Sequence, residues 1–388
     1  MKISEVADIN KVNLLAKENV DIIKYLDTSN LTEGIIDEVQ ILTKGKDKIP
    51  SRAKRKVKKD DILISTVRPN LKHYGLIKEN DENLIVSTGF AVLTPNTKIV
   101  DPRYLYYYLT SENITNYLHM VACTSTTSYP SIKPSVIGDI NIDLPTIEEQ
   151  KKIGDLLSAI DDKIFLNNEL NKELDELSQL IFEKWLNENE AKSVELRELC
   201  SLITDGSHSS PTTVETGFPM ASVKDMTHFS IDIKKCRNIS KDDYDSLVKG
   251  NCKPKINDIL VAKDGSYLKH IIHVKEEENI VLLSSIAILR PNLNKIHPII
   301  LKRYLLIPSM KKALEDGYVT GTALKRIILK SFRRFPIAVP SIKKQSEIID
   351  ILNKLEDRIY LNVKENEDLN TLRDTLISQI FSGKIKIK

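Results

Sequence analysis

A chain of 388 residues, with 41% hydrophobic residues and a formal net charge of only +3, is long enough for two domains and too apolar to be disordered throughout. No apolar run reaches the roughly 18 residues of a membrane span, the N-terminus lacks an apolar signal region, and the four cysteines form no C-x-x-C pair. We therefore expect a cytoplasmic protein that binds no membrane and holds neither a zinc site nor a disulfide framework.

A basic stretch at residues 44–59 is the first region with a distinct character. It contains nine lysines and arginines and a single aspartate. Positive charge clustered in this way is typical of a surface that binds a polyanion. A solvated lysine-rich face is an equally good interpretation from charge alone.

Short β-branched runs bounded by Gly, Pro or Asn follow, at residues 61–66 and 84–95, and they predict strands. Residues 101–118 predict an amphipathic helix behind these strands. A long helix follows from Thr146, where the sequence Thr-Ile-Glu-Glu fits a capping box. The same order then recurs, with strands at 258–263 and 280–291, a helix at 297–314 and a second long helix.

The second half of the chain repeats the first. A shift of 195 positions aligns the two long helices without a gap, with Pro145 on Pro340 and Gln150 on Gln345. Similar shifts align the preceding segments, so the chain is a duplicated unit. We predict an α+β fold with two tandem α/β domains and two long helices. The expected boundaries are 1–145 for the first domain, 146–190 for the first helix, 191–340 for the second domain and 341–388 for the second helix.

The long helices carry an apolar seam at coiled-coil spacing, and seven of its ten positions are apolar in both copies. Asparagines interrupt the middle of both seams, at Asn167, Asn171, Asn362 and Asn366. A buried Asn needs a polar partner and thereby fixes the register of a helix pair. We predict that the two helices form an intramolecular antiparallel coiled coil. The alternative is that each helix packs separately on its own domain.

We find no sequence pattern that indicates catalysis. The chain lacks N-P-P-Y, G-x-G-x-x-G and G-x-x-x-x-G-K-[ST] motifs. Residues 205–208 place a carboxylate, a hydroxyl and an imidazole together, but they are too close in sequence for a catalytic triad. The chain is therefore expected to recognise a ligand rather than to transform one.

This duplicated order of domain, helix, domain and helix resembles the specificity subunit of type I restriction-modification systems. The resemblance extends to the P-x-x-x-x-Q sequences at 145–150 and 340–345, the helix ends at 182–186 and 380–384, and the segments 50–53, 61–63, 203–208 and 258–260. It covers essentially the whole chain.

The resemblance implies a DNA-binding subunit with no catalytic activity and no cofactor of its own. It also implies assembly with two methyltransferase subunits, which hold S-adenosylmethionine and methylate adenine. Restriction subunits using ATP and Mg²⁺ would complete a nuclease. Each domain would read one half of a bipartite, asymmetric target in double-stranded DNA, while the coiled coil sets the spacer and docks the methyltransferase subunits. Two alternatives are a coiled-coil adaptor for protein partners and a self-contained enzyme that acts on nucleic acid.

Base recognition requires hydrogen-bonding side chains in a groove, and phosphate contacts require cations. The candidates for contact with DNA in the first domain are Arg52, Arg55, Thr66, Arg68, Asn70, Lys72 and His73, with a further polar loop at 124–129. The candidates in the second domain are Ser207, His208, Lys263, Asp264, Ser266, Lys269, His270, Thr322, Lys325 and Arg326. A solvated turn is the alternative interpretation for each of them. The loop after the first strand differs between the domains, so the two half-sites should differ in sequence.

Overall fold

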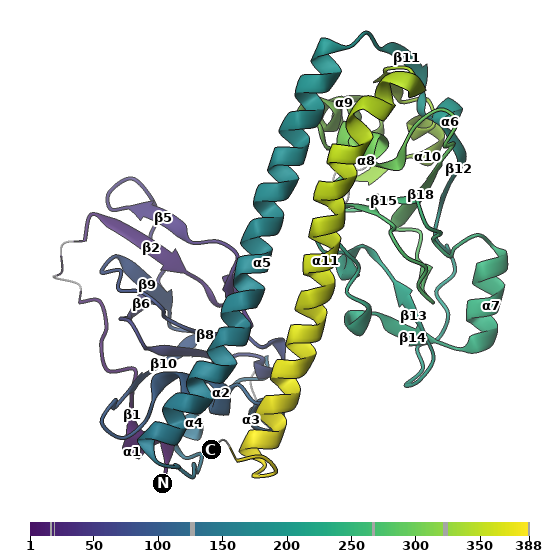
Figure 1. Cartoon of the computed structure of the whole chain (residues 1–388). Coiled ribbons are helices and arrows are strands. Elements are labelled where there is room, and N and C mark those ends of the chain that lie inside the picture. Colours follow the sequence, from purple (N-terminus) through teal and green to yellow (C-terminus); the bar gives the residue numbers. More distant parts are fainter. Residues whose placement is uncertain (16–17, 19, 125–128, 266–267, 321–324, 387–388) are drawn as a thin grey trace. The chain divides into compact units, whose positions relative to one another are not determined.

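The computed structural model describes residues 1–388 except 16–17, 19, 125–128, 266–267, 321–324 and 387–388 (Figure 1). The chain forms two compact units. Unit 1 comprises residues 1–164 and 368–388, and unit 2 comprises residues 165–367. Both units combine helices and sheets, so the prediction of a mixed α/β protein is confirmed. No helix in the described part of the chain is both long and apolar enough to cross a membrane.

Unit 1 is built around two sheets. The first has the order β1-β10-β7-β8 with every pair antiparallel, and the second has the order β5-β2-β9-β6 with β2 and β9 parallel. Their strands are β1 (Ala7–Ile9), β2 (Ile22–Leu26), β5 (Gln40–Thr43), β6 (Ala53–Lys56), β7 (Ile62–Ser65), β8 (Tyr74–Leu76), β9 (Leu84–Ser87) and β10 (Phe90–Pro95). A short hairpin joins β3 (Leu31–Thr32) to β4 (Ile35–Ile36).

Strand β7 lies between two hydrophobic cores, which explains its three consecutive apolar residues, Ile62 to Ile64. Ile62 and Ile64 point into a core formed with the helices of unit 1. Leu63 points the opposite way, into a core shared with Leu26 and Val86 of the second sheet. Because side chains alternate along a strand, only a fully apolar run can serve both cores.

Five helices of unit 1 begin in the first half of the chain: α1 (Ile3–Val6), α2 (Pro102–Leu109), α3 (Glu112–Cys123), α4 (Pro134–Gly138) and α5 (Ile147–Glu188). The single helix predicted over 101–118 is in fact two helices. The chain breaks at Thr110 and Ser111, whose hydroxyl groups donate to carbonyl oxygens of α2. Such side-chain bonds to the backbone compete with continuation of a helix.

Unit 2 repeats the order of the first sheet, and its second sheet has three strands in place of four among the described residues. Its first sheet has the order β12-β18-β15-β16, and its second has the order β14-β13-β17 with β13 and β17 parallel. These strands are β12 (Cys200–Asp205), β13 (Phe218–Ala221), β14 (Arg237–Ile239), β15 (Ile259–Ala262), β16 (Ile271–His273), β17 (Val281–Leu282) and β18 (Ile286–Pro291). Two further pairs join β11 (Lys192–Glu195) to β21 (Pro336–Val339), and β19 (Val319–Thr320) to β20 (Arg326–Ile327).

The helices of unit 2 follow the same order, with α7 as an additional helix between β14 and β15. They are α6 (Leu196–Leu199), α7 (Lys241–Lys249), α8 (Pro298–Leu306), α9 (Pro308–Gly317), α10 (Leu329–Phe332) and α11 (Ile342–Phe381). Here too the single helix predicted over 297–314 is two helices. Pro308 has no N–H to donate and keeps Ile307 out of the helical conformation, so α8 ends and α9 begins at this point.

The long helices α5 and α11 contribute to both units. In unit 1, Ile153 and Leu157 of α5 share a core with Ile377 of α11. In unit 2 the seam is polar: Asn167 donates to Asn366 over 2.9 Å, and Asn362 donates to Asn171 over 2.8 Å. The paired positions run in opposite directions along the two helices, so the helices are antiparallel here.

Each long helix is attached to its preceding domain by a buried glutamine. In unit 1, Gln150 accepts from the N–H of Asp101 over 2.9 Å and donates to the carbonyl of Pro145. In unit 2, Gln345 bonds in the same way to His297 and Pro340. The glutamine of the P-x-x-x-x-Q sequence therefore bonds the first turn of each long helix to the residues just before an earlier helix of the domain, α2 in unit 1 and α8 in unit 2. The capping box predicted at Thr146 is also present.

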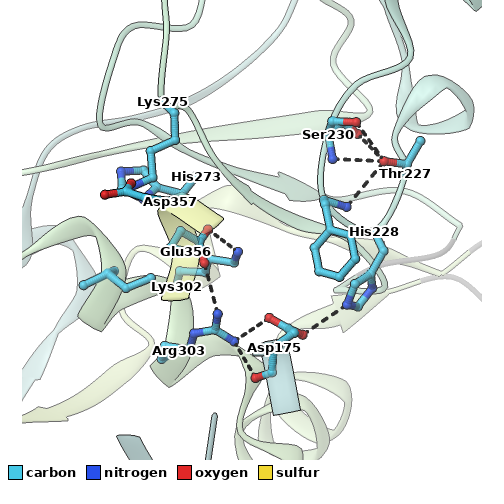
Figure 2. A network of polar contacts seen from close by, with 12 residues as sticks. Asp175, Thr227, His228, Ser230, His273, Lys275, Lys302, Arg303, Glu356 and Asp357 are labelled. Carbon is cyan, nitrogen blue, oxygen red and sulfur yellow. Dashed lines mark hydrogen bonds and ion pairs between the residues drawn. The ribbon is translucent and has the colours of Figure 1, made fainter. Parts of the chain in front are cut away.

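In unit 2 a buried ionic network joins α8 to the long helices α5 and α11 (Figure 2). Glu356 of α11 accepts from Lys302 over 2.5 Å and from Arg303 over 3.0 Å, both from α8. Arg303 also pairs with Asp175 of α5 over 2.6 Å, and Asp175 meets His228 over 3.2 Å. Burial alone would raise the pKa of Glu356, but the charges of Lys302 and Arg303 lower it to about 2.

Candidate nucleic-acid interface

The loop after β7 is anchored firmly in unit 1. The Thr66 carbonyl accepts from the N–H of Ile132 over 2.9 Å, and the Arg68 N–H donates to the carbonyl of Pro130 over 2.8 Å. Arg68 has φ 47° and ψ 65°, and Lys72 has φ 54°, so both lie in the left-handed region. These bonds bring residues 66–72 and 129–132 into one surface.

The loop after β15 is anchored in the same way in unit 2. The Lys263 carbonyl accepts from the N–H of Ile327 over 3.0 Å, and the Gly265 N–H donates to the carbonyl of Lys325 over 2.9 Å. The side chains of Asp264 and Arg326 form an ion pair of 2.9 Å across the two segments. Each unit therefore pairs the loop after one of its inner strands with a segment 60 or more residues further along the chain.

Several of the predicted DNA-contacting residues have exposed side chains on or beside these paired loops: Arg52, Arg68, Asn70, Lys72, His208, Lys269, Lys325 and Arg326. Lys72 pairs with Glu33 over 2.9 Å. His208 lies 3.2 Å from Asp205. The guanidinium carbon of Arg68 lies 4.8 Å from the ring centroid of Tyr129, which is a cation–π contact.

In unit 1 two other predicted residues are engaged in the fold. The hydroxyl of Thr66 donates to the carbonyl of Gly89 over 2.9 Å. The Nδ1 atom of His73 lies 2.8 Å from the carbonyl oxygen of Leu31. Arg55, a third predicted residue, lies on β6 and donates to Asn13 over 2.7 Å.

In unit 2 the buried side chains of Ser207 and Lys263 are likewise engaged. Lys263 is only 4% exposed, and its side chain pairs with Asp205 over 2.6 Å. The Ser207 hydroxyl bonds to Ser209 over 2.8 Å. His270 is half-buried, and that burial lowers its pKa. Ser266 and Thr322 lie outside the described residues, as do residues 125–128 of the polar loop.

Two features of this surface escaped sequence reasoning. One is the stacking of Arg68 on Tyr129, which joins residues 61 positions apart and has no local signal. The other is the position of Asp205, which forms an ion pair with Lys263 and also lies 3.2 Å from His208. The Asp-Gly-Ser-His sequence at 205–208 is notable for its functional groups, but only the fold reveals that the carboxylate pairs with Lys263, which directly follows β15.

The family description "Type I restriction modification DNA specificity domain" matches residues 1–176 and again residues 188–371. The chain belongs to this family. The resemblance noted from the sequence is thereby confirmed, and the two matches correspond to its two halves.

Named relatives and a solved structure agree with this assignment. The chain is 26% identical over 412 residues to the type I restriction enzyme HindI specificity subunit of Haemophilus influenzae, covering 87% of this chain and 89% of that protein. It is 23% identical to the putative MjaX specificity subunit of Methanocaldococcus jannaschii, covering 100% and 93%. The crystal structure of a type I restriction-modification S subunit from M. genitalium has the same fold, with a TM-score of 0.55, 17% identity and coverage of 98% and 95%.

Proposed function

We propose that this chain is the sequence-specific DNA-recognition subunit of a type I restriction-modification complex. Each domain would read one half of a bipartite, asymmetric target in double-stranded DNA. The observation that carries this proposal is the paired loop in each unit. The loop of one unit makes the same pattern of backbone hydrogen bonds as the loop of the other unit. The exposed side chains of the two loops differ, which is what two unequal half-sites require.

The long helices would act as the spacer between the half-sites, as an intramolecular antiparallel coiled coil. A helix of 40 residues extends about 60 Å at 1.5 Å per residue. It is therefore stiff and long enough to hold two reading surfaces apart by one turn of DNA, roughly 34–36 Å. The asparagine pairs Asn167–Asn366 and Asn171–Asn362 support this role, because a helix pair that slipped in register would bury unpartnered amides.

The helices would also dock the two methyltransferase subunits. Leu166 and Leu177 are exposed on α5 and lie 11 residues apart, which brings them to nearly the same side of the helix. The equivalent positions on α11, Leu361 and Leu372, are exposed as well. The same apolar pair on both helices supports binding of two copies of one partner rather than of two different partners.

The chain would contribute recognition and no chemistry. S-adenosylmethionine would be held by the methyltransferase subunits, and ATP and Mg²⁺ by the restriction subunits. The support lies in unit 2, where Asp205 pairs with the buried Lys263 and Asp264 pairs with Arg326, so these charged groups are engaged in ion pairs with one another.

The test is to express the chain with and without its methyltransferase subunit and to map methylated adenines across the host genome. A bipartite, asymmetric motif that appears only when both proteins are present is the expected result. Electrophoretic binding to DNA carrying that motif, with and without the methyltransferase subunit, provides the biochemical control. DNA binding that is absent in both states would support a protein adaptor, and methylation by the purified chain alone would support an enzyme.

A further inference from the structure

Arg68 occupies a backbone position at which the fold favours glycine. Its φ of 47° lies in the left-handed region, where an L side chain is strained. The equivalent residue in unit 2 is Gly265, with φ 66°. The backbone bonds match as well. The N–H of Arg68 donates to the carbonyl of Pro130 over 2.8 Å, and the N–H of Gly265 donates to the equivalent carbonyl of Lys325 over 2.9 Å.

The two units thus form the same turn with different residues. Glycine adopts this conformation without strain, whereas arginine does not. The backbone bond at this position uses only the N–H and would be unchanged in a glycine. The strain at Arg68 is therefore a cost that glycine would avoid, and a role for the arginine side chain would offset it.

The Arg68 side chain adds little to the packing of unit 1. It is exposed, and among the described residues no carboxylate pairs with its guanidinium. It makes a cation–π contact with Tyr129, a residue that is itself 60% exposed. Strained residues held by a rigid surrounding structure are concentrated at functional sites, and Arg68 lies on the surface proposed to bind DNA.

We infer that Arg68 reads a guanine in the half-site of the first domain, an inference that rests on the proposed function. A guanidinium presents two parallel N–H donors that match O6 and N7 of guanine in the major groove, and no other base offers two acceptors there. The Tyr129 ring holds the guanidinium against one face and leaves its donor edge free to approach a base. The bonds to Pro130 and Ile132 fix the loop before DNA arrives.

This assignment separates Arg68 from a residue that contacts phosphate. A phosphate contact raises affinity for every sequence and steepens the dependence of affinity on salt. A side chain that bonds to guanine instead changes the affinity for one DNA sequence relative to another. The second domain has no equivalent side chain at Gly265, so a change at Arg68 should leave the other half-site untouched.

The experiment compares the wild-type chain with Arg68→Gly and Arg68→Lys, each expressed with the methyltransferase subunit, by genome-wide mapping of methylated adenines. Wild type should require a guanine at one position of one half-site. Arg68→Gly should accept other bases at that position alone, and Arg68→Lys, which keeps the charge without the planar fork, should relax it in part. In binding assays, replacing that base pair should weaken wild type about 10- to 100-fold and the glycine variant less than about twofold.

Thermal unfolding of Arg68→Gly distinguishes a reading role from a structural one, because glycine suits the turn. Its Tm should equal or exceed that of wild type. A lower Tm would overturn the inference, as would an unchanged guanine requirement or a uniform loss of affinity for all sequences with a shallower salt dependence. Failure of the wild-type complex to methylate any bipartite motif would instead refute the proposed function, so the two failures are distinguishable.

Discussion

Replacing Glu356 with glutamine should destabilise unit 2 severely while changing few atoms. Glu356 is 5% exposed and balances Lys302 and Arg303, which are 3% and 0% exposed. Glutamine keeps the size of the side chain but removes its negative charge. Asp175 is then the one carboxylate of this network left to balance the two buried cations. Removing one partner from a buried ionic network is strongly destabilising, because it leaves charge without compensation.

The magnitude follows from the pKa. A carboxyl whose pKa falls from 4.5 in the unfolded chain to about 2 in the folded chain contributes about 3 kcal/mol to the free energy of unfolding at neutral pH. Because the folded pKa is the lower one, this contribution is complete above pH 4.5 and is lost as the pH falls toward 2. The difference between wild type and Glu356→Gln should therefore be largest near pH 7 and shrink below about pH 4.

Trp185 provides the assay. It is the single tryptophan of the chain and lies buried in the core of unit 2, so its fluorescence during urea denaturation reports on this unit. The matched control is Asp357→Asn, one residue away, whose exposed carboxylate pairs with Lys275 over 2.9 Å. This exposed pair should contribute less than about 1 kcal/mol. If the two variants lost equal stability at pH 7, or if the loss in Glu356→Gln stayed constant down to pH 3, the reasoning would be refuted.

Three further predictions concern the helices and the DNA surface. Gln150→Leu should lower the stability of unit 1 by about 1–3 kcal/mol, because the buried N–H of Asp101 loses its acceptor; calorimetry that gave an unchanged Tm would contradict this. Replacing Asn171 and Asn362 together with leucine should raise the urea midpoint of unit 2, since the buried Nδ2 atom of Asn171 and Oδ1 atom of Asn362 have no hydrogen-bond partner in the described structure. A lower midpoint would show that the pair is a net source of stability. Lys269→Ala should weaken binding to target and unrelated DNA alike and reduce the slope of log affinity against log salt by about 0.9, whereas an unchanged slope would exclude a phosphate contact.

The long helices were predictable because their signals are local. The periodic seam and the capping box at Thr146 predicted a helix over 146–190, and α5 spans Ile147–Glu188. The apolar strands β7, β10, β15 and β18 were predictable for the same reason, since each lies in a short apolar run bounded by turn residues, although the runs 84–95 and 280–291 each contain two strands. Polar strands such as β6, with the sequence Ala-Lys-Arg-Lys, carry no such signal. The breaks between α2 and α3 and between α8 and α9 were missed, although Pro308 was a signal for the second of them.

The roles of the polar loop residues were not predictable from local sequence. From sequence alone, Thr66 and Lys263 were as good candidates for DNA contact as Arg68 and Lys269. Thr66 bonds to a carbonyl 23 residues away, and Lys263 pairs with a carboxylate 58 residues away. Whether a polar side chain faces solvent or a buried partner depends on such distant neighbours, and only the fold supplies them.

The division of the chain into units has a consequence for the order of events during synthesis. Unit 2 is a single continuous stretch, residues 165–367, and its core can close as soon as that stretch has left the ribosome. Unit 1 needs residues 368–388 as well, because Phe381 packs edge-on against Tyr104 and Tyr108. The domain that is translated first is therefore the one completed last. Until the final helical turns emerge, its tyrosines stay uncovered, and a chain cut short after residue 367 would keep the later unit and lose the earlier one.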